Sequence, residues 1–118
     1  MPGLSIHVVD VSRGVVATGM AVEVVFIADG GERRPIAAGT ISDKGTLDHP
    51  ALAVVLEAGR YQAAFRVAEY YRGCGVTLPA VPFLGIVTYD FGIADPQQHY
   101  HLPFKCTPWG YSCFRGGV

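Results

Sequence analysis

The sequence has no excess of charge of either sign. Of its 118 residues only 16% are charged, the formal net charge is −1, and half of the residues are hydrophobic. A nucleic-acid-binding domain usually carries a basic face, so this balance gives no reason to expect a nucleic-acid partner. The length suits one domain with one hydrophobic core, and we expect residues 1–118 to form a single domain.

The chain also lacks a long apolar run. Met1-Pro2-Gly3 leads directly into a strand pattern that polar residues interrupt. This start has neither the basic flank nor the continuous hydrophobic stretch of a signal peptide or a membrane span. We therefore expect a cytoplasmic protein with no membrane partner.

Cysteines are few, and their number is odd: Cys74, Cys106 and Cys113. An odd set in a chain expected in the cytoplasm argues against a disulfide framework, so we expect free thiols. A disulfide between Cys106 and Cys113 is the minor alternative, because these two residues flank a turn-like segment at 107–111.

Segments that favour β-strands occupy most of the chain. Apolar and β-branched residues, broken by Gly, Asp and Pro, predict strands at residues 4–9, 21–28, 33–41, 60–67, 84–93, 99–106 and 111–115. Only residues 67–72 have a helical pattern, bounded by Gly73 and Gly75. Short strands at this spacing predict an all-β fold, a mostly antiparallel β-sandwich with one short helix.

His7 is the first polar residue that interrupts an apolar strand. Strand alternation puts His7 on the same face as Ser5 and Val9, whereas Asp10 lies on the opposite face and is not expected to pair with it. Taken alone, His7 is most simply a partly exposed histidine at the surface of a sheet.

The segment His99-Tyr100-His101 carries two more imidazoles. A period of two residues places His99 and His101 on one face of their strand. Such a pair suits zinc if a third ligand, such as His7 or a cysteine, comes from elsewhere; it also suits metal-free acid–base chemistry near neutral pH. Because no further ligand lies at a characteristic spacing, we expect no metal ion.

The C-terminal segment 108–118 combines aromatic residues with glycines and Arg115. Aromatic side chains favour ordered packing, and the planar guanidinium of an arginine can bind an anion with several donors. From the residues alone, however, the simplest role for Arg115 is that of a solvated terminal arginine.

Several segments together resemble the 5-hydroxyisourate hydrolases of the transthyretin-like family. Those near the N-terminus are His7-Val8-Val9-Asp10, Arg13-Gly14 and Gly19-Met20-Ala21-Val22. Those near the C-terminus are His99-Tyr100-His101-Leu102-Pro103, Gly110-Tyr111-Ser112 and Phe114-Arg115-Gly116. In the middle they are Ser42-Asp43-Lys44-Gly45, Gly59-Arg60-Tyr61 and Glu69-Tyr70-Tyr71. The resemblance covers essentially the whole chain.

This resemblance implies a fold, an assembly and a reaction. The fold is a transthyretin-like β-sandwich, assembled as a homotetramer with active sites at the dimer–dimer interface. The reaction is hydrolytic opening of the ring of 5-hydroxyisourate in urate degradation, a part of purine metabolism, without a cofactor. His7 and His101 match the two catalytic histidines of the family, and Arg115 matches the arginine of its C-terminal Tyr-Arg-Gly-Ser tetrapeptide. Tyr111 belongs to the same closing motif, and we expect it to contact the substrate.

Three residues depart from the family pattern. Thr46 stands where the family has an arginine, Phe114 replaces the tyrosine of the tetrapeptide, and Gly117 replaces its serine, with Val118 as an extra residue. We expect Thr46, Gly117 and His49 to line the substrate site. His49 is either a replacement donor or a surface residue beside a turn. Each lost donor to a developing charge can cost a few kcal/mol of transition-state binding.

Two classes of function therefore stay open. The first is an enzyme, either a 5-hydroxyisourate hydrolase or a relative recruited in specialised metabolism to open or rearrange a different bicyclic or lactam-like small molecule. The second is a non-catalytic carrier of an apolar aromatic ligand, which the gain of Phe114 and Val118 favours. An enzyme should bring His7 and His101 close together, and since fold alone does not decide function, this proximity discriminates between the two.

Overall fold

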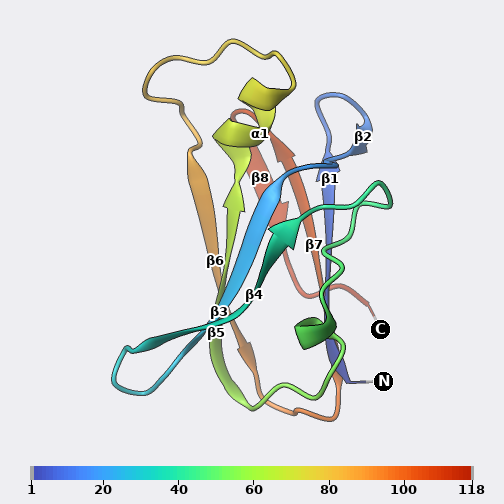
Figure 1. Cartoon of the computed structure of the whole chain (residues 1–118), viewed down its shortest axis with the longest axis vertical. Coiled ribbons are helices and arrows are strands. Elements are labelled where there is room, and N and C mark those ends of the chain that lie inside the picture. The colour runs from blue at the N-terminus through green and yellow to red at the C-terminus, as the bar shows by residue number, and fades with distance from the viewer. Residues whose placement is uncertain (1, 118) are drawn as a thin grey trace.

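The computed structural model describes residues 2–117, which form two four-stranded sheets packed face to face (Figure 1). Within these residues there is one α-helix, and it is seven residues long. The predicted β-sandwich with one short helix is thereby confirmed. Val118 lies outside the described residues. No helix in residues 2–117 is long and apolar enough to cross a membrane.

The two sheets draw their strands from different parts of the chain. In the first sheet the order is β2-β1-β7-β8, and the bounds are β1 (Gly3–Asp10), β2 (Val15–Val16), β7 (His99–Thr107) and β8 (Gly110–Cys113). In the second the order is β4-β3-β5-β6, and the bounds are β3 (Ala21–Ile27), β4 (Arg33–Thr40), β5 (Gly59–Arg66) and β6 (Ile86–Ile93). The 3₁₀-helix η1 (Pro50–Leu52) and the α-helix α1 (Val67–Gly73) lie in the connections.

The pairing of β1 with β7 is parallel, whereas the other strand pairs of the described chain are antiparallel. A parallel pair needs a long crossover connection, and here almost the whole chain supplies it. The register sets Ser5 beside His101 and Gly3 beside His99. The start of β1 and the segment that follows β8 lie on the same side of the molecule (Figure 1).

Strand alternation divides the first sheet into a buried face and an outer face. Ile6, Leu102 and Phe104 point into the core, where each is at most 2% exposed. Phe104 stacks on Phe65 of the second sheet, with ring centroids 3.9 Å apart. The residues that alternate with them along β1 and β7 are half-buried or exposed, so His7, His99, His101 and Lys105 lie on the outer face.

Two details differ from the sequence-based expectation. The predicted strand at 111–115 is too long, because β8 ends at Cys113 and the chain then leaves the sheet. The hairpin register sets Cys106 opposite Tyr111 and Cys113 opposite Phe104, so the two cysteines are not cross-strand partners. All three cysteines are free thiols, and Cys106 is buried.

Asp10, at the end of β1, is a fully buried carboxylate that joins the sheet to α1. Its Oδ1 accepts hydrogen bonds from the hydroxyls of Tyr71 and Ser12, both at 2.7 Å, and its Oδ2 accepts one from Tyr70 at 2.9 Å. Burial acts to raise the pKa of Asp10, but the hydrogen bonds from Ser12, Tyr71 and Tyr70 outweigh it, so the pKa is lower than usual. The carboxylate is therefore ionised at neutral pH.

We expect Tyr71→Phe to lower the free energy of unfolding by about 1–3 kcal/mol at pH 7, because a buried acceptor loses a donor. The hydroxyl of Tyr71 also donates to the carbonyl of Cys106 at 3.1 Å. Since the folded pKa of Asp10 lies below its ordinary value of 3.8, the stability that this cluster contributes is present above that value and is lost as the pH falls through the folded pKa. Urea unfolding at one fixed protein concentration measures both effects.

The control for this prediction is Tyr89→Phe, which removes a hydroxyl from a half-buried tyrosine outside the cluster. Equal losses of stability in Tyr71→Phe and Tyr89→Phe would contradict the role given to Asp10.

Candidate functional site

The outer face of the first sheet carries three imidazoles. His7 comes from β1, and His99 and His101 come from β7; all three are half-buried. The shared face of His99 and His101 is the one that alternation predicts. Asp10 points to the core side of β1, so it makes no pair with His7, again as alternation predicts.

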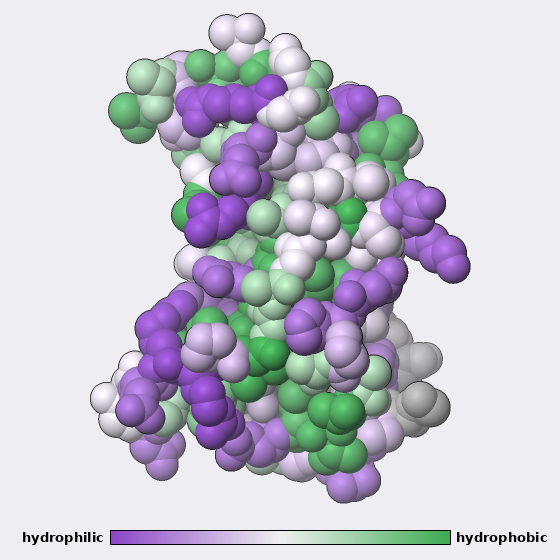
Figure 2. Space-filling view, viewed as in Figure 1, coloured by the Kyte–Doolittle hydropathy of each residue, from purple (hydrophilic) through white to green (hydrophobic). Residues whose placement is uncertain are grey.

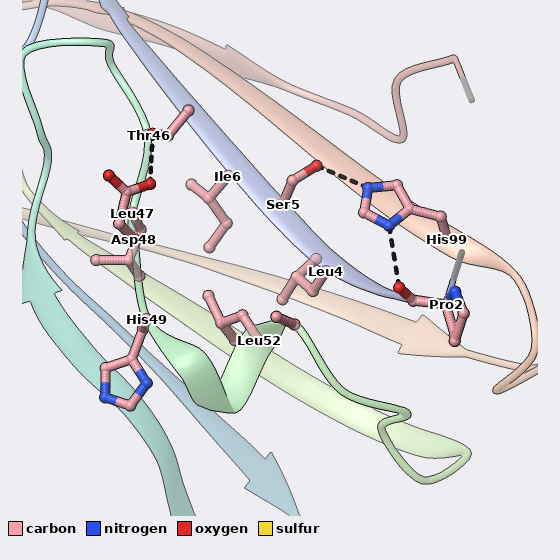
Figure 3. A pocket seen from close by; sticks show the side chains of 11 residues that line it. Pro2, Leu4, Ser5, Ile6, Thr46, Leu47, Asp48, His49, Leu52 and His99 are labelled. Atoms are coloured by element: carbon pink, nitrogen blue, oxygen red, sulfur yellow. Dashed lines mark hydrogen bonds between the residues drawn. The ribbon is translucent and has the colours of Figure 1, made fainter.

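Ser5 lies between the two imidazoles of β7. Its Oγ is 2.8 Å from Nε2 of His99 and 2.6 Å from Nδ1 of His101. On the far side of the His99 ring, Nδ1 lies 3.5 Å from the carbonyl oxygen of Pro2 (Figure 3). Sequence reasoning placed Ser5 on the face of His7 but assigned it no function, because nothing in the sequence indicates that β1 and β7 are neighbours.

His101 has a pKa below the usual value for histidine. Burial is the largest cause, and the electrostatic influence of His7 and then of His99 follows, while a hydrogen bond with the backbone of Ser5 acts in the opposite direction. His101 is therefore neutral at neutral pH and able to accept a proton. In the register of β1 with β7, His101 is the partner of Ser5 and His7 is the partner of Pro103, so His7 and His101 occupy successive outward-facing positions of the two neighbouring strands.

The turn before Thr46 packs against His7. Gly45 has a φ of +86°, and a Cβ added there would lie 2.8 Å from Nε2 of His7 and 2.6 Å from Cγ1 of Val16. Glycine is therefore the residue that both the conformation and the space at this position require. Thr46 follows in an isolated backbone bridge with His7, so the turn is held directly beside the imidazole.

Thr46 and His49 line a cavity of about 350 Å³ that Ser5 and His99 border on the other side (Figure 3). Oγ1 of Thr46 donates to Asp48 at 2.7 Å. This wall of the cavity therefore carries a hydroxyl and a carboxylate at the place where the family resemblance implies an arginine. Nδ1 of His49 accepts the backbone N–H of Ala51 at 3.1 Å and caps η1. His49 is thus tied to the backbone of η1 through Nδ1 while it also lines the cavity.

The segment after β8 crosses over β7. The backbone N–H of Gly116 donates to the carbonyl of His101 at 2.7 Å, and a Cβ added to Gly116 would lie 2.7 Å from Cδ2 of that histidine. The guanidinium of Arg115 donates to Gln98 at 3.1 Å and to the carbonyl of His99 at 3.2 Å. It also lies 4.0 Å from the centre of the Tyr100 ring. Arg115 is exposed, and these surface contacts hold its guanidinium at the start of β7.

The structure does not bring Tyr111 to the histidines, although its place in the closing motif led us to expect it there. Tyr111 pairs with Cys106 and stacks on Phe104, with ring centroids 5.5 Å apart. Both partners belong to the core face of β7, so Tyr111 lies on the opposite side of the sheet from His101. Gly117 is exposed, and nothing lies within 4 Å of a Cβ added there.

Metal binding has no support among residues 2–117, where no three His, Cys, Asp or Glu side chains gather in a way that could hold a metal ion. The chemistry that the outer face offers is proton transfer by imidazoles, with the pKa of His101 lowered and the hydroxyl of Ser5 beside it. Arg115 is anchored next to Tyr100, whose ring belongs to the buried face of β7.

Comparison with known proteins gives consistent results. Residues 4–116 match the sequence model of the HIUase/Transthyretin family. The 5-hydroxyisourate hydrolase of Ralstonia nicotianae is 38% identical, over 98% of this chain and 99% of that protein. The structure of Klebsiella pneumoniae 5-hydroxyisourate hydrolase is similar with a TM-score of 0.78 and 28% identity, over 99% of this chain and 100% of that one. Sea bream transthyretin, solved in complex with thyroxine, has a TM-score of 0.84 at 24% identity, over 98% of this chain and 96% of that one, and it shares the fold.

Proposed function

Because the chain belongs to the HIUase/transthyretin family, we propose that it is a hydrolase that opens the ring of 5-hydroxyisourate, a cyclic amide derived from a purine. The observation that carries this proposal is the register of β1 with β7, which sets His7 and His101 at successive positions on one outer face, where burial lowers the pKa of His101. A carrier of an apolar ligand has no use for such a pair. The likeness to a thyroxine-binding protein concerns the fold and does not favour a carrier.

In the proposed reaction His101 is the general base. It takes a proton from a water molecule while the water oxygen bonds to the carbonyl carbon of the ring amide. The carbon–nitrogen bond of the ring then breaks, and His7 donates a proton to the leaving nitrogen. Each proton has a named donor and acceptor, so no metal or organic cofactor is needed.

Arg115 is proposed to hold the substrate at the edge of the site. Its anchoring to Gln98 and to the carbonyl of His99 fixes the guanidinium before substrate arrives, which reduces the entropy lost on binding. A guanidinium at this place attracts the electron-rich carbonyl oxygens of the substrate. Arg115 would therefore act mainly in binding and less in the chemical step.

Thr46 and Gly117 reduce the number of polar groups that the proposed site offers to the substrate. With a hydroxyl at position 46, bonded to Asp48, the wall beside His7 lacks the cation that the family resemblance implies. Stabilisation of the developing oxyanion then falls to fewer donors. This departure is the one observation that favours the second candidate, a relative acting on a different lactam-like substrate.

We also propose that the chain acts as a cytoplasmic homotetramer with its sites at the dimer–dimer interface. Large apolar side chains are exposed next to the tail, among them Trp109 at 68% and Phe114 at 46%. Figure 2 shows further apolar surface over the segment that follows η1, where Val54 and Val55 are each half exposed. Association would cover such surface. Free thiols are in keeping with a reducing compartment.

The test of the proposed function is turnover of freshly generated 5-hydroxyisourate, followed by its ultraviolet absorbance against the spontaneous rate. We expect His7→Ala and His101→Ala each to lower kcat by a factor of about 100 or more, since general acid–base catalysis contributes 10²–10⁴. Arg115→Ala is the matched comparison, and it should raise KM more than it lowers kcat. Light scattering on the same samples should report an unchanged assembly. Near-normal turnover in both histidine variants would defeat the catalytic roles.

A second test restores the missing polar groups in the double variant Thr46→Arg, Gly117→Ser. We expect kcat/KM for 5-hydroxyisourate to rise at least about tenfold, because a guanidinium returns to the wall beside His7. The open space at Gly117 accommodates the serine. Thr46→Met with Gly117→Ser supplies the control for side-chain length without charge. No gain, together with full activity of the unmodified protein, would show that these departures do not limit catalysis.

A further inference from the structure

We infer that Ser5 and His99 are positioning residues that hold His101 in the form whose Nε2 accepts a proton. They do so through a relay of hydrogen bonds that starts at the carbonyl of Pro2. The inference rests on the proposed function, in which His101 is the general base. It assigns roles to two side chains that would otherwise be neighbours of the site.

The direction of the relay is set at its first member. A carbonyl oxygen only accepts hydrogen bonds, so Nδ1 of His99, 3.5 Å from the carbonyl of Pro2, must be the donor. A neutral imidazole has one N–H group, and in His99 that group is now used. Nε2 of His99 therefore has a lone pair and acts as an acceptor.

Ser5 is the second member of the relay, and it determines which nitrogen of His101 carries the proton. The hydroxyl of Ser5 has a single proton, and it donates that proton to Nε2 of His99 over 2.8 Å. Its oxygen then accepts a hydrogen bond from Nδ1 of His101 over 2.6 Å. With the proton of His101 on Nδ1, the nitrogen left to accept a proton from water is Nε2.

The sheet register explains why a serine fits between the two histidines. Residues two apart on one strand are separated by roughly 6.5–7 Å. Ser5 is the register partner of His101, and it lies two residues from Gly3, the partner of His99. A short hydroxyl on the neighbouring strand can therefore reach both rings. On the other side of β7, Gly116 binds the carbonyl of His101 through its backbone N–H and fixes the strand there.

The charged groups around the relay agree with this direction. His7 from β1 and His99 from β7 both lower the pKa of His101 and so favour its neutral form. Arg115, from the tail, binds the carbonyl of His99 and leaves the imidazole nitrogens to their partners. Lys105 lies further along the same face of β7 and is exposed.

The direct test is the tautomeric state of the two histidines of β7. Two-bond ¹⁵N–¹H correlation spectra of the ¹⁵N-labelled protein at about pH 8 distinguish Nδ1–H from Nε2–H imidazoles. We expect Nδ1–H for His99 and for His101 in the unmodified protein. In Ser5→Ala, His99 should keep that form and His101 should shift to Nε2–H. Ser112→Ala removes a hydroxyl from β8 on the outer face of the same sheet, and it should change the tautomer of neither His99 nor His101. An Nε2–H form of His101 in the unmodified protein would overturn the inference.

The kinetic consequence separates positioning from a merely structural role. Ser5→Ala should lower kcat for 5-hydroxyisourate by roughly 10–100-fold with little change in KM, which is the usual scale for losing a residue that orients a reactive group. Ser5→Thr keeps the hydroxyl and should recover most of this loss. Unchanged kcat in Ser5→Ala would refute the inference. The expected tautomers in a protein that does not turn over 5-hydroxyisourate would support the relay and reject the proposed function instead.

Discussion

The parallel pairing of β1 with β7 is the constraint on which the rest of the site depends. This pairing joins the two ends of the chain and sets Ser5 beside His101. Because side chains alternate along a strand, a slip of one residue would turn every outer histidine toward the core. The register is therefore a condition for the chemistry as well as for the fold.

Interactions on the buried side of the sheet hold this register. Ile6, Leu102 and Phe104 fill the core, and Phe104 stacks on Phe65 of the opposite sheet. At the far end of the pair, the hydroxyl of Tyr71 on α1 lies 2.7 Å from the carboxylate of Asp10 on β1 and 3.1 Å from the carbonyl oxygen of Cys106 on β7. These two residues are register partners, so the helix joins both strands at the same level. The imidazoles on the outer face are thus positioned by packing and hydrogen bonds on the inner face.

The sequence predicts on which face of a strand a side chain lies better than it predicts which strands are adjacent in a sheet. A period of two residues is enough to put His99 and His101 on one face and Asp10 opposite His7, and the structure agrees on both points. That same period says nothing about which strands lie side by side, so the contact of Ser5 with both imidazoles could not be predicted. Tyr111 shows that a motif does not by itself give the face on which a side chain lies. Its motif suggested the site, but the hairpin register places it beside Cys106 on the core face.

The central claim is that His7 and His101, from opposite ends of the chain, act as one catalytic unit. Turnover of 5-hydroxyisourate by the double variant His7→Ala, His101→Ala, measured beside the two single variants, tests it most directly. Residues that act as a unit give non-additive losses, so the double variant should be about as slow as the slower single variant. Losses that multiply, as they do for independent sites, would contradict the account.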